Sequence, residues 1–399
     1  MQRNVRLYPI YYALFVLMGW LPIFFLFFGR YVTIEQVLRL EALYYISVVV
    51  IEVPSGYFSD RIGRRPTLII STLSMSAAYL CFLGGSTFGV FALGQILLAI
   101  GFGFQSGTDT SLHFDSLAAL GREAEYGERE AIANRNSFIS GAVGTLLGGA
   151  LGLLSLRYAY VISLAGMLGA LAIAWSFKEP PRSDTTPGVL TQLRACINYA
   201  RQRPLAWLLI FVVLMTIIEH IPYEFYQPYI SLLGEEEPLF AGRAPLIAGV
   251  VMAVSKLFGA WAADRSIAIA RRFGTAPTLI GAALLETVVI ATMGLLLHPL
   301  IVLVIFMRDV PGSLAFAPRN AAIAPRVGQA QRATYFSLQS LLGRFAFSLT
   351  LVGLSLLAGT DAPTDWPTLA AMLRTSAVIG ASGLAVLLLL MGWMKEQES

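Results

Sequence analysis

The stretch IEVPSGYFSDRIGRRPTL, Ile51 to Leu68, decides the fold because it joins two apolar segments of membrane-spanning length through a short polar loop. Its glycines permit a tight turn and close approach of helices, and Asp60 can cap the helix that follows. Its arginines can pair with acids at neighbouring helix ends. A positive loop at a membrane surface would explain the arginines but not the glycines and the aspartate. The residues concerned are Gly56, Asp60, Arg61, Gly63, Arg64 and Arg65.

The composition on both sides of this loop is that of an integral membrane protein. Of the 399 residues 56% are hydrophobic and 13% are charged, whereas soluble domains have about 25% charged residues. Apolar segments long enough to cross a bilayer recur along the whole chain, and each should be a helix because lipid offers the backbone no hydrogen-bond partner. We predict twelve spans, at residues 8–29, 35–57, 66–85, 88–114, 131–154, 157–177, 205–230, 245–264, 275–297, 299–323, 333–357 and 366–394.

The basic residues predict the orientation of the chain. With the N-terminus inside, 19 of the 28 Lys and Arg residues, Arg319 among them, fall in cytoplasmic pieces and four fall outside. This bias places both termini in the cytoplasm and the protein in the inner, cytoplasmic membrane. The net charge of +4 reflects the same excess of cytoplasmic Lys and Arg residues. It therefore does not indicate binding to nucleic acid, which is not expected as a partner.

The longest polar interruption divides the chain into two halves. We expect a six-helix bundle at residues 1–178, a cytoplasmic loop at 179–204 and a second six-helix bundle at 205–399. Within the loop, VLTQLRACINYARQR suits either an amphipathic helix on the inner surface or an irregular linker. The pair Asp60 and Arg61 after the second span corresponds to the pair Asp264 and Arg265 after the eighth span. Such parallel repeats are a transporter architecture with the site between the halves.

The loop from Gly56 to Arg65 resembles the G-x-x-x-D-[RK]-x-G-[RK]-[RK] loop of the major facilitator superfamily, and Glu52-Val-Pro-Ser-Gly resembles the E-x-P-[ST]-G lead-in of many bacterial members, drug exporters included. The resemblance covers the whole chain. It implies an all-α integral membrane protein with twelve transmembrane helices in two six-helix bundles related by pseudo-two-fold symmetry. It also implies that the loop is a conformational latch, in which Asp115 is the acid that pairs with Arg64.

Two exporter patterns are incomplete. The fourth span has Gly101 and Gly103 but Leu97 where proton-coupled exporters have an arginine, and Thr145 replaces the proline of the fifth-span pattern. The small residues that remain in the fifth span allow close helix packing, and we interpret them in that way. They are Gly144, Gly148, Gly149 and Gly152.

The fourth span ends in SGTDTSLHFDSL, which contains two aspartates. On an ideal helix Asp109 lies about 9 Å deeper than Asp115 and is rotated from it by about 240°, so the two should have different roles. Asp109 shares a face with His113. A carboxylate in a partly dry cavity has a raised proton affinity, which makes Asp109 a candidate proton-coupling residue.

Asp109 and His113 each have an alternative interpretation. A structural ion pair of Asp109 with Arg135 or Arg344 is equally open. We expect His113 at the membrane interface, with a proton-relay role as the alternative.

The seventh span, IIEHIPYEFYQPYI, contains a second polar cluster. We expect its two prolines, Pro222 and Pro228, to interrupt the helix and expose backbone groups to a cavity. One helical face carries Glu219, Tyr223 and Tyr226, although tyrosines can also form an interfacial belt. We expect Glu224 to be the more exposed of the two acids. Elsewhere, Glu286 and the adjacent Arg308 and Asp309 are interpreted as structural pairs.

No nucleotide-binding loop or metal-ligand spacing is recognisable, so we expect no cofactor, no metal and no enzymatic activity. The prediction is a secondary active transporter of small molecules, monomeric, working by alternating access and exporting amphipathic compounds in exchange for protons. One alternative is a carrier of an organic anion or lipid-like metabolite, in which Arg135 and Arg344 form a cationic cavity. A membrane sensor or membrane enzyme is a third.

Overall fold

The computed structural model describes residues 1–181, 196–328, 332–359 and 364–395, and every regular element in these ranges is a helix. The chain forms two compact units. The first contains Met1–Asp184 and Gly242–Val250, and the second contains Thr185–Ala241 and Val251–Ser399. The central segment at residues 182–195 lies outside the described ranges, while residues 196–200, at its end, are helical.

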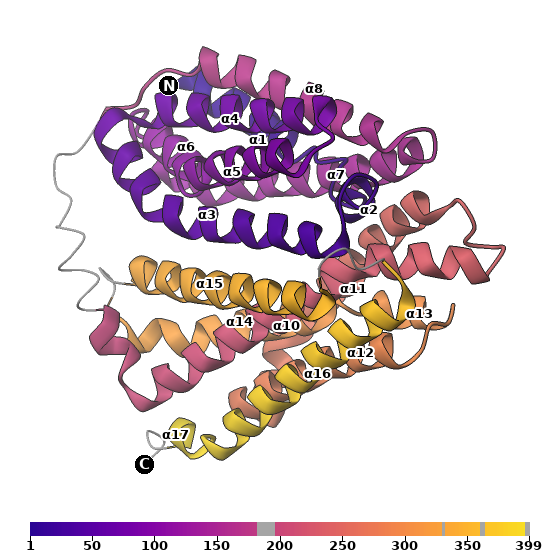
Figure 1. Ribbon diagram of the computed structural model, residues 1–399. Coiled ribbons are helices and arrows are strands. Elements are labelled where there is room, and N and C mark those ends of the chain that lie inside the picture. The colour runs from indigo at the N-terminus through magenta and orange to yellow at the C-terminus, as the bar shows by residue number, and fades with distance from the viewer. Residues whose placement is uncertain (182–195, 329–331, 360–363, 396–399) are drawn as a thin grey trace. The chain divides into compact units, whose positions relative to one another are not determined.

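The first unit is built around α4 and α5 (Figure 1). Helix α4 packs against α3, α5 and α8, and α1 packs against α7 and α8. The bounds are α1 Gln2–Phe15, α2 Phe24–Phe28, α3 Ile34–Ile62, α4 Arg64–Gly84, α5 Phe88–Gln105, α6 Thr108–Ala118, η1 Glu123–Glu125, α7 Tyr126–Gly152 and α8 Leu156–Ser176.

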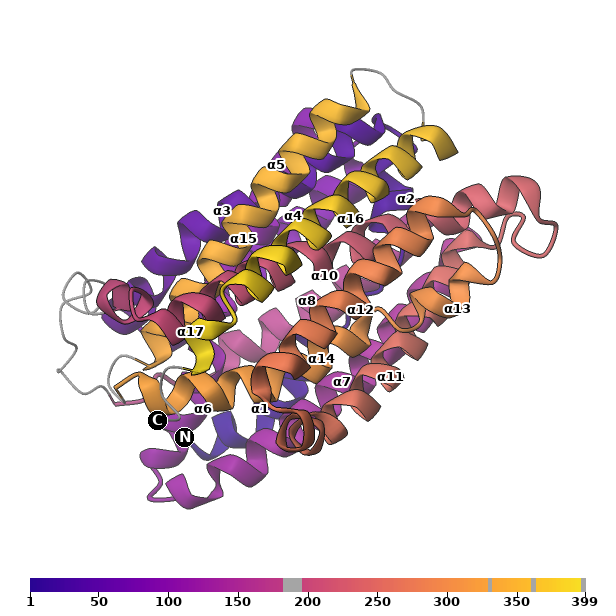
Figure 2. The ribbon, with the colours of Figure 1, turned by 90° about the horizontal axis from the view of Figure 1, so that it is seen from below.

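The second unit has α10 and α12 at its centre. Helix α10 packs against α12, α15 and α16, and α12 packs against α14 and α16 (Figure 2). The bounds are α10 Arg203–Glu236, α11 Ala244–Phe273, α12 Thr275–Leu295, α13 Ile301–Ile305, α14 Asp309–Ile323, η2 Ala324–Arg326, α15 Arg332–Ala358, α16 Trp366–Leu389 and α17 Gly392–Lys395.

The helices account for the predicted membrane spans. Within the described ranges, nine helical segments are long and apolar enough to cross a membrane by length and composition. Helices α3 and α7 are also long enough, with 29 and 27 residues, but contain several charged side chains. The first span is divided between α1 and α2. Each of the twelve predicted segments therefore has a helical counterpart.

Three spans are broken where the sequence predicted continuous helices. The breaks lie between α1 and α2, between α5 and α6, and between α13 and α14. The break in the fourth span falls at Gly107, which has a left-handed φ of 73° that glycine adopts without strain. It places Asp109 in the first turn of a new helix rather than deep within an old one.

The expected interruption of the seventh span is wrong. Helix α10 runs without a break through Pro222 and Pro228 for 34 residues. Proline removes one backbone hydrogen bond, but nearly every residue from Ile221 to Leu233 is buried. Packing against the neighbouring helices keeps α10 continuous despite the local cost.

Equivalent turns occur in the two units. Gly63, with φ 128°, separates α3 from α4, and Gly274, with φ 90°, separates α11 from α12. Both Asp-Arg pairs lie inside helices rather than after them. Asp60 and Arg61 lie at the end of α3, whereas Asp264 and Arg265 lie well before the end of α11 at Phe273. The internal repeat is therefore marked by the two glycines, not by the two Asp-Arg pairs.

The glycines of the fifth span lie at close helix contacts. A Cβ atom on Gly144 would lie 3.2 Å from the backbone nitrogen of Met18, and one on Gly148 would overlap the backbone of Gly19. A Cβ atom on Gly149 or Gly152 would press against Pro245, within the short segment that belongs to the first unit. Backbones approach this closely only where side chains are absent.

Candidate functional site

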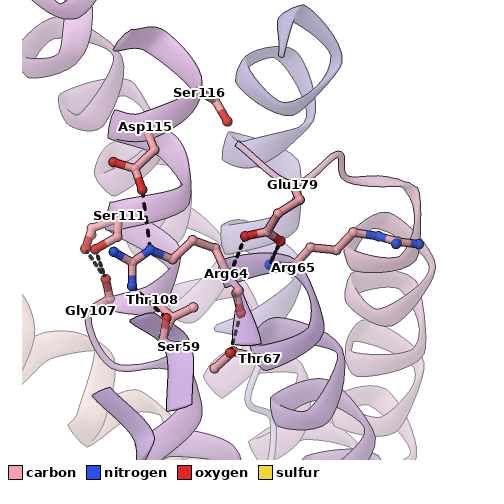
Figure 3. A network of polar contacts seen from close by, with 12 residues as sticks. Ser59, Arg64, Arg65, Thr67, Gly107, Thr108, Ser111, Asp115, Ser116 and Glu179 are labelled. Carbon is pink, nitrogen blue, oxygen red and sulfur yellow. Dashed lines mark hydrogen bonds and ion pairs between the residues drawn. The ribbon is translucent and has the colours of Figure 1, made fainter. Parts of the chain in front are cut away.

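The loop between α3 and α4 joins three helix ends through the Arg64 side chain. Its Nε lies 3.4 Å from an Asp115 oxygen on α6, and its Nη1 donates to the Ser59 hydroxyl at 2.9 Å (Figure 3). Thr108, at the start of α6, donates to the same hydroxyl at 3.1 Å. The ion pair expected between Arg64 and Asp115 is therefore present, while the burial of Gly56 and the side chain of Asp60 lie outside what the structure describes.

Glu179, which the sequence analysis did not single out, holds the start of α4. Its carboxylate accepts the backbone N–H groups of Arg64 and Arg65, each at 2.8 Å (Figure 3). A negative charge at a helix N-terminus satisfies free N–H donors and interacts favourably with the helix dipole. The Arg65 guanidinium in turn donates to the Trp175 carbonyl on α8, so this loop is tied to the end of the last helix of the unit. Arg61 is exposed on the last turn of α3.

Asp109 lies in a buried hydrogen-bonded chain. Its side chain is 6% exposed and accepts a hydrogen bond of 2.8 Å from Gln105 Nε2. The Gln105 carbonyl oxygen accepts in turn from the Tyr11 hydroxyl at 2.6 Å. The Arg135 side chain, which the sequence offered as a partner, is exposed on α7, and the charged side chain that interacts with Asp109 is Glu130, a second acid.

His113 is fully buried within the protein, while its expected position at the membrane interface stays a prediction. Its Nδ1 lies 2.8 Å from a Glu130 oxygen, and its ring stacks on Tyr8 at 4.1 Å between centroids. The Tyr8 hydroxyl donates to the other Glu130 oxygen at 3.3 Å. The His113 Nε2 atom is buried without a hydrogen-bond partner among the described residues. Two acids, a histidine and two tyrosines from α1, α6 and α7 thus form one polar cluster.

Glu130 was missed because the run EYGEREAIANR reads as a charged loop. In the structure α7 begins at Tyr126, so Glu130 occupies its second turn and faces α6. Its spacing from His113 carries no sequence signal because the two residues lie on separate helices. Near Glu130 but outside the membrane spans, Arg122 and Arg129 pair with Glu125 and hold the pKa of its carboxyl group at about 2.

The second unit contains a cavity of about 310 Å³. Glu219, the seventeenth residue of the 34 in α10, is exposed in this cavity, and Arg319 of α14 lines it as well. Its apolar walls include Met215 and Phe316. Arg319 was counted among the cytoplasmic basic residues from the sequence, although it falls within the predicted span at 299–323. In the structure it lies on α14, half-buried, and lines the cavity.

A second group of charges lies on α12 and where α13 meets α14. Arg308 is 3% exposed, and its Nε lies 3.4 Å from an Asp309 oxygen. Its guanidinium lies 4.4 Å from the ring centroid of Tyr226 and 5.5 Å from that of Tyr223, within range of cation–π attraction. The carboxylate of Glu286 on α12 interacts electrostatically with Arg308 and has no hydrogen-bond partner among the described residues.

The expected exposure of the two acids on α10 is reversed. Glu224 is fully buried, whereas Glu219 is the exposed one. The packing of α10 decides which of the two acids faces the cavity. Arg344 lies on α15, half-buried, and interacts electrostatically with His220 of α10.

The chain is made of helices of membrane-spanning length, with buried acids inside both of its units, and ionisable groups at membrane depth are typical of transporters. The family model of the Major Facilitator Superfamily matches residues 9–351, and the chain belongs to this superfamily. No curated protein matches the sequence.

Solved structures with the same fold are those of transporters. The nucleoside transporter NupG has a TM-score of 0.76 and 15% identity, with 96% of this chain and 99% of that chain covered. A POT family transporter in complex with 5-aminolevulinic acid has a TM-score of 0.69 and 14% identity, covering 98% and 96%. A bacterial homolog of the human lysosomal transporter Spinster, in an inward-facing and unoccupied conformation, has 0.68 and 13%, covering 98% and 95%. At these identities the likeness concerns the fold.

Proposed function

We propose that this protein is a proton-coupled exporter of small amphipathic compounds that works by alternating access. The observation that carries the proposal is the buried cluster of Asp109, Glu130 and His113. Acids at membrane depth are costly and are retained where they bind ions or protons. The side chain that bonds to Asp109 is a neutral amide, Gln105, so a proton can be bound and released there without breaking an ion pair.

The substrate site of this proposal is the cavity of the second unit. It combines apolar walls with the charged side chains of Glu219 and Arg319, as binding of an amphipathic molecule requires. Two solved transporters of the same fold, a nucleoside transporter and a POT family transporter in complex with 5-aminolevulinic acid, also support a small-molecule cargo. In this proposal the termini are cytoplasmic and the protein acts as a monomer in the inner membrane.

An organic-anion carrier is the second candidate, because two guanidinium groups of the second unit lie at its cavity or beside α10. Arg319 lines the cavity, and Arg344 interacts with α10. Each of these guanidinium groups can bind a carboxylate or phosphate, and the first unit has an exposed arginine of its own, Arg135. The direction of proton coupling and the charge of the transported compounds separate the two candidates.

The test is transport into proteoliposomes with a chemically varied panel of small compounds. If the protein exchanges protons for substrate, an acidic lumen drives uptake, because protons leave the lumen as substrate enters. We expect uptake of at least one amphipathic compound with an acidic lumen and its loss when an ionophore collapses the gradient. Uptake driven by an alkaline lumen would indicate symport and contradict the export mechanism, and uptake of anions alone, without a gradient, would favour the second candidate.

We propose further that the contact between Arg64 and Asp115 is a latch that stabilises one conformation. The two side chains are 22% and 33% exposed, and such pairs add only about 0–1 kcal/mol to stability. Arg64→Gln should therefore leave the thermal unfolding temperature nearly unchanged while lowering the transport rate several-fold at unchanged KM. Asp115→Asn should add little to the effect of Arg64→Gln. Equal transport rates of Arg64→Gln and the exposed control Arg271→Gln would argue against the latch.

A further inference from the structure

The cavity of the second unit presents one negative and one positive side chain to the same small volume. Glu219 enters it from the middle of α10, and Arg319 enters it from α14. The two groups interact electrostatically, yet in the described part of the chain no nitrogen of Arg319 lies within 4.0 Å of a Glu219 oxygen, so they form no ion pair. Space between two unlike charges is therefore available to a molecule that carries both charges itself.

The Glu219 carboxylate lies against a glycine on the facing helix. A Cβ atom on Gly312 would lie 2.7 Å from the Glu219 carboxyl carbon, so a larger residue there would displace this flexible side chain. Helix α11 approaches the same part of α14, where a Cβ atom on Gly259 would lie 2.9 Å from the Ser313 hydroxyl. The carboxylate therefore occupies the space that Gly312 leaves open where α10 packs on α14.

The deeper charges are already engaged with one another. Arg308 has Asp309 at 3.4 Å and two tyrosine rings beside it, and it interacts with Glu286. Arg319 differs, because its Nε donates to Asn320 on its own helix at 3.1 Å and its guanidinium lies near the Phe316 ring. Its remaining N–H groups can bind a carboxylate of a ligand.

We propose that this cavity binds a small zwitterion, with the ligand's ammonium at Glu219 and its carboxylate at Arg319. The inference rests on the proposed function of a carrier and names the substrate class of that same cavity. A volume of about 310 Å³ suits a molecule of amino-acid size, since it is at the lower end of the range for ligand pockets. Met215 and Phe316 provide apolar contacts for the chain between the two charges.

The experiment is a binding measurement on the purified full chain in detergent, at neutral pH and without any gradient. The probes are ω-amino acids of graded chain length, from β-alanine to ε-aminocaproate, and the best of them is compared with the alkylamine and the carboxylate of the same length. We expect the zwitterion to bind about tenfold more tightly than either analogue, because each charge gains its own charge-assisted hydrogen bonds.

The variants assign each charge. Glu219→Gln should abolish the tighter binding of the zwitterion relative to the carboxylate analogue, and Arg319→Gln should abolish its tighter binding relative to the amine analogue. The matched controls Glu235→Gln on α10 and Arg271→Gln on α11, both at exposed positions, should keep both differences in affinity. Gly312→Ala, which keeps both charges but displaces the Glu219 carboxylate, should act like Glu219→Gln. A thermal unfolding scan of each variant verifies that it is folded.

Equal affinities for the three probes, tighter binding of the amine alone or the carboxylate alone, or no binding at millimolar concentration would each overturn the zwitterion site. Because binding is measured without a gradient, this failure is separate from failure of the proposed transport mechanism. A protein that prefers zwitterions but shows no proton-driven uptake would contradict the coupling and leave the site standing.

Discussion

Asp109→Asn should abolish substrate uptake driven by an acidic lumen while leaving exchange of substrate for substrate intact. Asparagine has nearly the same shape as aspartate and keeps an oxygen that can accept from Gln105. It cannot bind and release a proton, so the driving force is lost without loss of the binding cavity in the other unit. We expect gradient-driven uptake to fall by about tenfold or more, as is typical for the removal of a group that transfers a proton.

The measurement compares two assays on one preparation of proteoliposomes, uptake under a pH gradient and counterflow at equal pH. Glu123→Gln is the matched control, because it also removes one carboxylate from the first unit but at an exposed position in η1. Gradient-driven uptake at the wild-type rate in Asp109→Asn would refute its coupling role. Loss of both assays together would instead assign Asp109 to folding or to substrate binding.

Substitutions of Glu130 or His113 should change gradient-driven uptake, but not in the same way as Asp109→Asn. Glu130 interacts with Asp109 and bonds to His113, so it can pass a proton between the cluster and the start of α7. The tyrosines of α1 that face the two acids, Tyr8 and Tyr11, are themselves hydrogen-bonded to this cluster. We therefore propose that proton coupling involves a set of groups on α1, α6 and α7, and not a single carboxylate.

Arg308→Met should lower the free energy of unfolding of the second unit by about 3–5 kcal/mol, the usual cost of removing one member of a buried charged pair. The guanidinium is 3% exposed and interacts with Glu286, whose carboxylate is fully buried. Without Arg308, Glu286 and Asp309 would lie close together with no compensating charge. The change in volume is small, so electrostatics accounts for most of the effect.

The double variant Arg308→Met with Glu286→Gln isolates the electrostatic part. It should recover a large share of the loss, because one of the two uncompensated acids is then neutral. Thermal unfolding in detergent measures each variant, and Arg271→Met, at an exposed position of α11, should change stability by less than about 0.5 kcal/mol. An unfolding temperature of Arg308→Met equal to that of the wild type would show that this arginine does not stabilise the fold.

The sequence by itself determined the class of the protein. Its apolar segments, too long and too frequent for a soluble domain, predicted the helices, and the loop around Gly63 and Arg64 predicted the superfamily. It also paired Arg64 with Asp115. The helices follow from a solvent that leaves the backbone few options, so segment length and periodicity predict them. The superfamily and the pairing of Arg64 with Asp115 came instead from the resemblance of the loop to a family motif.

Only the tertiary structure decided which charged side chains meet. It placed Glu130 beside His113 and brought Arg319 into the cavity with Glu219, pairs that lie on separate helices and leave no spacing signal in the chain. It also kept α10 continuous through Pro222 and exposed Glu219 rather than Glu224. Rotation and packing of each helix are set by its neighbours, because the free energy gained by burying a helix face exceeds the local preference of a single proline or glutamate.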